Sequence, residues 1–305
     1  KALLKVLKAT FQKLGYEVCH STGETPDAGG NWQRFEINRK IITVAGRPSV
    51  SDGPPLPQKP DDLPPIHIWD EKLCPFADNF FHLDNYFQWI GNMDNAIASK
   101  AEPNEGYYFL ASQSHYPEDF PHPGNGALDK AIHKAVNLFN EQVCQLGASP
   151  MAIPLPVMLF PMGSPVKGGP EEACNDIYHF LSMSYVNCIV ENYMTDTGWR
   201  IVNVYLPDFR ESLEEIHRQS INQNIPLTQS DFRKGISPLW EVVYGEQLAD
   251  DKITKESLEN FIYSVQHKIA AGLYRLGFTN VCFVRHRFHA LSHKRGALHC
   301  ITKIV

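Results

Sequence analysis

The sequence lacks several features that would each assign the protein to a specific class. No apolar run approaches the roughly 20 residues that a membrane-spanning helix needs, and neither a signal-peptide pattern nor a lipidation motif is present. No Asn-x-Ser/Thr acceptor occurs, and the seven cysteines form neither Cys-x-x-Cys pairs nor a dense framework. These absences predict a cytoplasmic protein with reduced cysteines and no membrane partner.

Positive charge is scarce as well. The chain has 28 Lys and Arg against 34 Asp and Glu, and this net charge of -6 argues against a general nucleic-acid binder, whose affinity rests on a basic surface. The one short basic cluster before Cys300 is a weak signal for a nucleic-acid patch. The glycine pair in residues 26–32 has no following Lys-Ser/Thr, which excludes a phosphate-binding loop. A mildly acidic protein instead favours cationic substrates.

What the sequence does contain is a repeated pattern within 305 residues, which we interpret as a single domain spanning 1–305. Helical periodicity in residues 3–15, 131–147 and 259–277 ends each time in Leu-Gly and leads into an apolar strand. The glycines that end these helices, Gly15, Gly147 and Gly277, are expected to adopt the left-handed C-cap conformation.

Alternating patterns predict four β-hairpins between these helices. They cover residues 31–46, residues 82–92 with 105–112, residues 184–205, and residues 296–305. Hairpins that alternate with helix–strand units indicate ββαβ modules, which favour a closed ring over a doubly wound sheet. Two segments interrupt the pattern: a Pro-rich loop at 47–65, and a polar stretch at 206–240 that we interpret as an insertion or flap.

The segment from Phe80 to Trp89 contains a candidate acid–base pair, His82 and Asp84. If this segment is a strand, residues two apart point to the same face, so the imidazole and the carboxylate project side by side. A water-exposed strand edge is the alternative. The flanking aromatic residues argue against it, because a half-buried ionisable pair needs a partner or a function.

Cys300 is the candidate nucleophile. Inert packing is the usual fate of a strand cysteine, but Arg285, Arg287, Lys294 and Arg295 lie close to Cys300 in sequence. Positive neighbours stabilise the thiolate, which is the reactive form. The same region offers a weaker zinc hypothesis, because four histidines precede the cysteine without a zinc-protease motif: His286, His289, His293 and His299.

These pieces occur in the order found in one known family. A Gly-Gly-Asn turn at 29–31 precedes His-Leu-Asp at 82–84, and Gly-x-x-His-Cys follows at 296–300. The chain thereby resembles the guanidino-group-modifying enzymes of the pentein fold, and within them the catalytic domain of protein-arginine deiminases. Residues 184–192 are similar to that family's Met-Val-Asn strand, and residues 276–300 to its last helix end, strand and nucleophile strand.

The resemblance implies an α/β fold: a closed ring of five ββαβ modules with fivefold pseudosymmetry, an α/β propeller around a central site. The first hairpin, which carries the family's first substrate-binding acid, has no counterpart in this sequence. The helix at 3–15 begins without a capping residue and the chain begins with Lys rather than Met, so we expect a fragment whose missing hairpin precedes Lys1. The alternative is a catalytically inactive relative that serves as a binding or regulatory module.

The resemblance also implies a reaction: arginine in a protein becomes citrulline, and ammonia leaves. Asp84 would bind the guanidinium, Cys300 would attack its carbon, and His82 would act as acid and then base. Lys294 and Arg295 match positions that contact the substrate backbone. No cofactor is identifiable from the residues, and calcium is an expectation from the resemblance alone.

Two other enzyme hypotheses stay open at this stage. A hydrolase or amidinotransferase acting on a small guanidino compound such as arginine, agmatine or dimethylarginine would use the same residues. A cysteine protease built from Cys300 and His82 is less favoured, because Asp84 would point into the site instead of orienting the histidine ring from behind.

Overall fold

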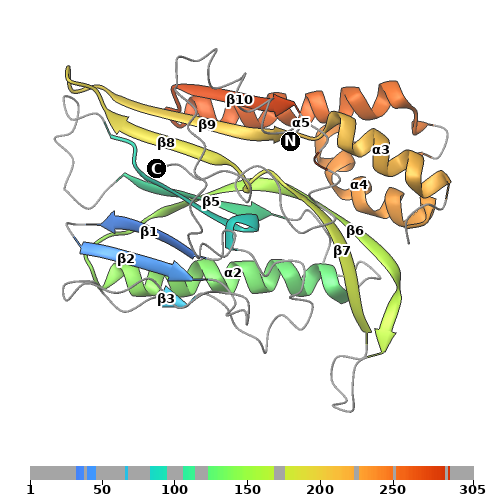
Figure 1. Cartoon of the computed structure of the whole chain (residues 1–305), viewed down its shortest axis with the longest axis horizontal. Coiled ribbons are helices and arrows are strands. Elements are labelled where there is room, and N and C mark those ends of the chain that lie inside the picture. The colour runs from blue at the N-terminus through green and yellow to red at the C-terminus, as the bar shows by residue number, and fades with distance from the viewer. Residues whose placement is uncertain are drawn as a thin grey trace, which may run out of the picture.

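The computed structural model describes residues 32–37, 40–45, 66–67, 83–94, 106–113, 123–167, 176–222, 227–249, 252–285 and 288. Within these residues the protein is a mixed α/β structure with three small β-sheets. The middle sheet lies between helix α2 on one side and helices α3 to α5 on the other (Figure 1).

The element bounds are as follows. The strands are β1 (Trp32–Ile37), β2 (Lys40–Ala45), β3 (Ile66–His67), β4 (Phe87–Asn92), β5 (Tyr107–Gln113), β6 (Met151–Lys167), β7 (Asp176–Ser184), β8 (Ile189–Met194), β9 (Arg200–Asp208) and β10 (Asn280–Arg285). The helices are η2 (Leu83–Asn85), α2 (Pro123–Cys144), α3 (Arg210–Ile221), α4 (Gln229–Tyr244) and α5 (Lys255–Arg275).

All three sheets contain the same strand arrangement. In each, an antiparallel pair is followed by a third strand that runs parallel to the second: β1-β2-β3, β4-β5-β6 and β8-β9-β10. Strand β7 extends the middle sheet by pairing antiparallel with the second half of β6. Because α2 connects β5 to β6 and α3 to α5 connect β9 to β10, two units have the full ββαβ order that the sequence predicted.

Three of the four predicted hairpins are confirmed. The pairs are β1 with β2, β4 with β5, and β8 with β9, and the last turns through Asp196, Thr197 and Gly198. The fourth predicted hairpin at 296–305, the helix–strand unit at 3–20 and the Pro-rich segment at 47–65 lie outside the described residues.

Two of the predicted helix–strand units are confirmed as α2 with β6 and α5 with β10. Each helix ends where a glycine takes a positive φ, 75° at Gly147 and 98° at Gly277. Only glycine enters this left-handed region without steric cost. The N–H of Phe278 then bonds to the carbonyl of Leu273 at 3.1 Å, which satisfies the end of α5 and turns the chain toward β10.

The hydrophobic core has two parts, one on each face of the middle sheet. The smaller part packs β1, β2, β4 and β5 against α2, and the larger part packs β6 to β10 against α3, α4 and α5. Neighbouring residues of β5 contribute to different parts, Phe109 to the smaller and Leu110 to the larger. The two-residue period of a strand produces this division.

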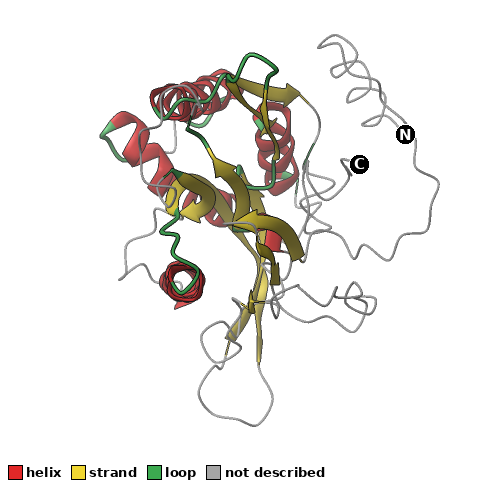
Figure 2. Cartoon of the chain, turned by 90° about the vertical axis from the view of Figure 1, so that its left-hand side faces the viewer, coloured by secondary structure: helices red, strands yellow, loops and turns green. Residues whose placement is uncertain are grey.

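The segment at 206–240, predicted as an insertion or flap, contains the end of β9, helix α3 and most of α4. Both helices bury an apolar side in the larger core, through Leu213 and Ile216 on α3 and Phe232 and Ile236 on α4. Figure 2 shows this helical part beside the strands. Whether it is inserted relative to a ring of modules stays a prediction.

Side-chain amides join the three sheets at the outer edge of β4. Gln33 of β1 donates to the carbonyl of Phe87 at 2.9 Å and accepts from the N–H of Trp89 at 2.9 Å. Asn192 of β8 donates to the carbonyls of Ile90 and Asn92 at 2.7 and 2.8 Å. Strand β4 therefore has partners on both sides although it ends its own sheet.

No helix among the described residues combines the length and the hydrophobicity that crossing a bilayer would take.

Candidate active site

The structure corrects the local conformation predicted for Asp84. Its main chain lies in the 3-10 helix η2 (Leu83–Asn85), and strand β4 begins only at Phe87. The same-face argument for residues 82 and 84 required a strand, so it does not apply at Asp84. Of the five predicted site residues, His82, Lys294, Arg295 and Cys300 lie outside the described residues, and the structure does not place them relative to Asp84.

The reason for the turn is the burial of polar groups around Asn85. Leu83 is fully buried and Asn85 is 2% exposed, and Tyr86 and Phe87 are buried as well, so burial does not alternate as it would in a strand with one exposed face. The N–H of Tyr86 bonds back to the carbonyl of Leu83 at 3.0 Å and closes the turn. This leaves the amide and the carbonyl of Asn85 directed at partners from other segments.

Three segments meet at Asn85. Its main-chain carbonyl accepts from the hydroxyl of Ser112 at 2.6 Å and from that of Ser184 at 2.7 Å. Its side-chain oxygen accepts from the amide of Asn187 at 3.0 Å. Ser112 lies in β5, Ser184 ends β7, and Asn187 precedes β8. We call Asn85, Ser112, Ser184 and Asn187 the asparagine–serine cluster.

This cluster is buried, and its polar groups bond to one another. Its four members are between 0% and 4% exposed, and in such surroundings each lost hydrogen bond leaves a polar group without compensation from water. The N–H of Ser112 also bonds to the carbonyl of Tyr86 at 3.1 Å. The main chain that directly follows Asp84 is thereby held by groups that lie far away in the sequence.

The aromatic residues beside η2 are buried as the sequence predicted for Tyr86 and Phe87, while Trp89 is half-buried. The ring of Trp89 stacks on Phe35 with centroids 4.1 Å apart, and Phe87 stacks on Phe109 at 5.1 Å. These contacts build an apolar wall along β4. Phe80 and Phe81 lie outside the described residues.

Among the three described cysteines, Cys188 and Cys282 are poor candidates for a competing nucleophile. Cys188 is fully buried, Cys144 is exposed, and Cys282 is half-buried in β10. Burial raises the pKa of the Cys282 thiol, which lowers its thiolate fraction at neutral pH. Cys144 and Cys282 form no disulfide among the described residues.

A second group of buried polar residues joins β9, α3 and α5. Asp208 is 1% exposed and accepts from Arg210 Nε at 2.9 Å and from Gln266 at 2.9 Å. Arg210 in turn lies 4.2 Å from the ring centre of Tyr263. Burial, with repulsion from Asp208, raises the pKa of Tyr185 well above its usual range. Asp208 and Arg210 form an ion pair that connects β9 to α3, and both charges have partners. We assign this pair a structural role and no part in a reaction.

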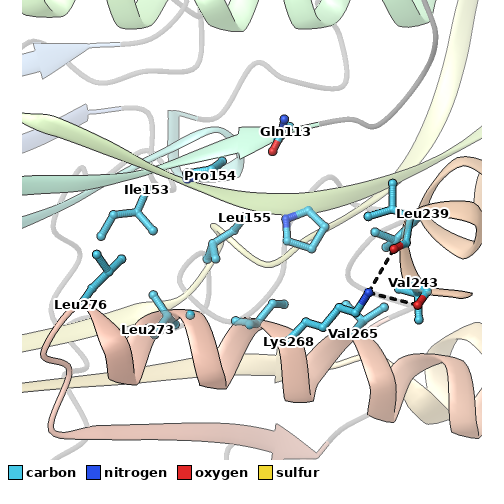
Figure 3. A pocket seen from close by; sticks show the side chains of 14 residues that line it. Gln113, Ile153, Pro154, Leu155, Leu239, Val243, Val265, Lys268, Leu273 and Leu276 are labelled. Atoms are coloured by element: carbon cyan, nitrogen blue, oxygen red, sulfur yellow. Dashed lines mark hydrogen bonds between the residues drawn. The ribbon is translucent and has the colours of Figure 1, made fainter. Parts of the chain in front are cut away.

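A groove of about 330 Å³ lies between β6, α4 and α5. Figure 3 shows Leu155, Leu239, Val265 and Leu273 lining it, with the ammonium of Lys268 at one side. Lys268 donates to the carbonyls of Val242 and Val243 at 3.0 Å each. Since its described lining contains no carboxylate, the groove offers no counter-charge for a guanidinium and is not the predicted site.

No grouping of three or more His, Cys, Asp or Glu suited to a metal ion occurs within the described ranges. The histidines of the zinc hypothesis at 286–299 fall outside those ranges, so that hypothesis stays untested.

Comparison with known proteins adds no assignment: the chain matches no protein-family model and shows no significant similarity to a curated protein.

Sequence reasoning missed the asparagine–serine cluster. The usable signal was the asparagine that directly follows Asp84 in His-Leu-Asp-Asn, together with the asparagine in the Tyr-Val-Asn-Cys segment at 185–188. Asparagine is disfavoured in strands and favoured in tight turns, so each of these residues indicated a turn at a strand end.

Proposed function

We propose that the protein is a cysteine-dependent hydrolase that deiminates a guanidino group, with arginine in proteins as the principal substrate. Citrulline and ammonia are the products. The proposal joins the sequence resemblance to protein-arginine deiminases with two features of the structure, a repeated strand unit and the constrained turn at Asp84.

The repeated strand unit supports the finer fold assignment, a closed ring of five ββαβ modules. Three units share an antiparallel pair plus a parallel third strand, and two of them have the helical crossover. Amide side chains link neighbouring units along β4 through Gln33 and Asn192. Successive modules joined in this way suit a ring whose remaining members lie outside the described residues.

The observation that carries the proposal is the asparagine–serine cluster. A carboxylate that holds a planar guanidinium through two parallel hydrogen bonds must keep a fixed orientation. Three chain segments donate buried hydrogen bonds to Asn85, in the turn that contains Asp84. Such rigidity at a turn with an acidic residue is expected for a binding site rather than for a connecting loop.

The reaction follows from the residue types. Asp84 binds the guanidinium and orients its carbon. The Cys300 thiolate attacks that carbon and forms a C–S bond, a C–N bond then breaks, and His82 protonates the departing nitrogen, which leaves as ammonia. His82 next takes a proton from water, and the hydroxide attacks the thiouronium carbon. The C–S bond then breaks to restore the thiolate, and the proton of the added hydroxyl group passes to solvent, where the released ammonia takes it up. The ureido group of citrulline remains.

The substrate assignment has a charge argument behind it. The net charge of -6 favours approach of cationic arginine side chains over anionic ligands. Lys294 and Arg295 would bind the backbone carbonyls of a peptide substrate. A free amino acid lacks the peptide backbone on either side of the arginine, so these contacts favour a protein substrate. Calcium, expected from the resemblance, is tested directly in the assay below.

The test is citrulline formation from a blocked arginine peptide and from free arginine, with and without calcium. Citrulline is expected from the peptide, and Cys300→Ala should abolish it. Asp84→Asn should lower kcat/KM at least about a hundredfold, because the guanidinium of the substrate loses its charged partner. Cys282→Ala is the matched control, a half-buried cysteine in β10 whose removal should leave activity in place.

Each other outcome points to a named alternative. Turnover of free arginine or another small guanidino compound, without turnover of the peptide, would replace the protein substrate by a small molecule. Citrulline that persists in Cys300→Ala would contradict the mechanism. No turnover of any guanidino compound would favour an inactive binding module.

A further inference from the structure

The contact between Asn85 and Asn187 differs from the others around η2. It is a bond between two buried side chains, with Asn187 fully buried and Asn85 2% exposed, and the residues are 102 positions apart. The hydroxyls of Ser112 and Ser184 hold the main-chain carbonyl of Asn85. Asn187 instead holds the side chain of Asn85, and this bond opposes rotation of η2 about its own axis.

Asn187 is itself held firmly enough to transmit orientation. It lies between Val186 and Cys188, both fully buried, and the N–H of Cys188 bonds to the carbonyl of Val186 at 2.8 Å across it. The N–H of Val186 bonds to the hydroxyl of Ser184 at 3.2 Å. A tight turn before β8 is therefore locked against a tight turn before β4.

We propose that Asn187 is a positioning residue that acts through Asn85 to set the orientation of Asp84 toward a cationic guanidino group. This inference rests on the proposed function, since it concerns the binding of that substrate class. Displacement by about 1 Å of a group that positions substrate costs about a hundredfold in rate. Loss of the Asn187 amide frees η2 to make such a displacement, while the thiol of Cys300 keeps its chemistry.

Two alkylating probes of nearly the same shape separate these effects. Chloroacetamidine is cationic and needs a carboxylate to draw it to the cysteine, whereas chloroacetamide is neutral and reports thiol reactivity alone. The measured quantity is the ratio of the two rate constants for alkylation of Cys300, followed by peptide mass spectrometry on the full chain. In the wild type the ratio should strongly favour the cation.

Asn187→Ala should lower this ratio about tenfold to a hundredfold, with the chloroacetamide rate nearly unchanged. Asn187→Asp keeps the shape but removes the donor at neutral pH, so it should act in the same direction and serves if the alanine variant does not fold. The double variant Asn85→Ala/Asn187→Ala should lose little more than either single variant, because both remove the same bond.

Asn203→Ala is the matched control. Asn203 is 4% exposed in β9 and bonds to Glu191 and Asn280 at 3.0 and 2.8 Å. The alanine variant therefore loses the hydrogen bonds of a buried amide, as Asn187→Ala does, but at a place away from η2. It should lower the melting temperature without changing the ratio.

A wild type without preference for the cation would overturn the proposed function and this inference with it. A wild-type preference that survives in both Asn187 variants would overturn the positioning role alone.

Discussion

His217 is a residue whose charge is set by its packing. It lies on α3 with its ring centroid 4.8 Å from that of Phe232 on α4, and it is half-buried. Burial lowers the pKa of His217, because the imidazolium is poorly solvated there. The folded protein therefore binds the proton less readily than the unfolded chain does.

The sign of the resulting pH effect follows by linkage. Because the folded pKa of His217 is below the unfolded value of about 6.5, its contribution to stability is complete above that pH and is lost as the pH falls. We expect the denaturation midpoint to drop between pH 7.5 and pH 5, and His217→Gln to show a smaller drop. The measurement is the urea midpoint of unfolding at each pH. An equal drop in the wild type and in His217→Gln would show that His217 contributes nothing to the pH dependence.

At the scale of elements, α4 packs against β6 at its closest approach through Gly235. A Cβ at this position would lie 2.3 Å from Cδ1 of Phe160 and 2.9 Å from the carbonyl oxygen of Leu159. The helix can approach the strand so closely because residue 235 has no side chain. Gly272 on α5 is the opposite case, since a Cβ there would meet nothing within 4 Å.

The pair gives a matched experiment. Gly235→Ala should destabilise the protein by about 1–3 kcal/mol through overpacking, although alanine has the better helix propensity. Gly272→Ala should stabilise it by up to about 1 kcal/mol, because only the propensity changes. The measurement is the free energy of unfolding in urea. A gain in stability from Gly235→Ala would show that α4 does not pack on β6 as described.

Elements with strong local signals were predictable from the sequence. Helices α2 and α5 and the hairpins formed by β1–β2 and β8–β9 follow from apolar periodicity and turn residues in single stretches of chain. The turn at η2 was not predictable in this way. Its determinants Ser112, Ser184 and Asn187 lie 27, 99 and 102 residues from Asn85, and no local pattern encodes contacts at that separation.

The candidate site was predictable to a smaller extent. His82, Asp84 and Cys300 came from residue types, local charge and a family resemblance, and of these the structure describes only the main chain at Asp84, in a conformation other than the predicted strand. The support for Asp84 could not be predicted, because asparagine and serine carry no charge pattern. Their role becomes visible only once β5, β7 and the turn before β8 lie together.

At the scale of the whole molecule, the arrangement consists of like units in contact. Each sheet repeats the same strand order, and polar side chains, in addition to the shared hydrophobic core, join neighbouring units at the edge of β4. The ion pair of Asp208 and Arg210, with Gln266, joins a strand end to two helices in the same way. Buried polar links of this kind fix orientation more than they add stability.

This arrangement explains why the asparagine–serine cluster lies where it does. It occupies the junction of β5, β7 and the start of β8, and the two parts of the core lie on opposite sides of the sheet to which β5 and β7 belong. In the proposed ring of modules, this junction would lie at the centre, where strand ends from several units would converge. We propose that the turn held there presents Asp84 to a guanidino group that Cys300 attacks.

The most direct test of this proposal is the mass of the peptide that contains Cys300, measured during turnover. The protein is mixed with excess blocked arginine peptide, quenched in acid within the first turnovers, digested and analysed by mass spectrometry. We expect an adduct on Cys300 that has the mass of the substrate less ammonia. This adduct should decay to citrulline and should be absent in Cys300→Ala. Citrulline formation with unmodified Cys300 at every quench time, or an adduct on another cysteine such as Cys282, would contradict it.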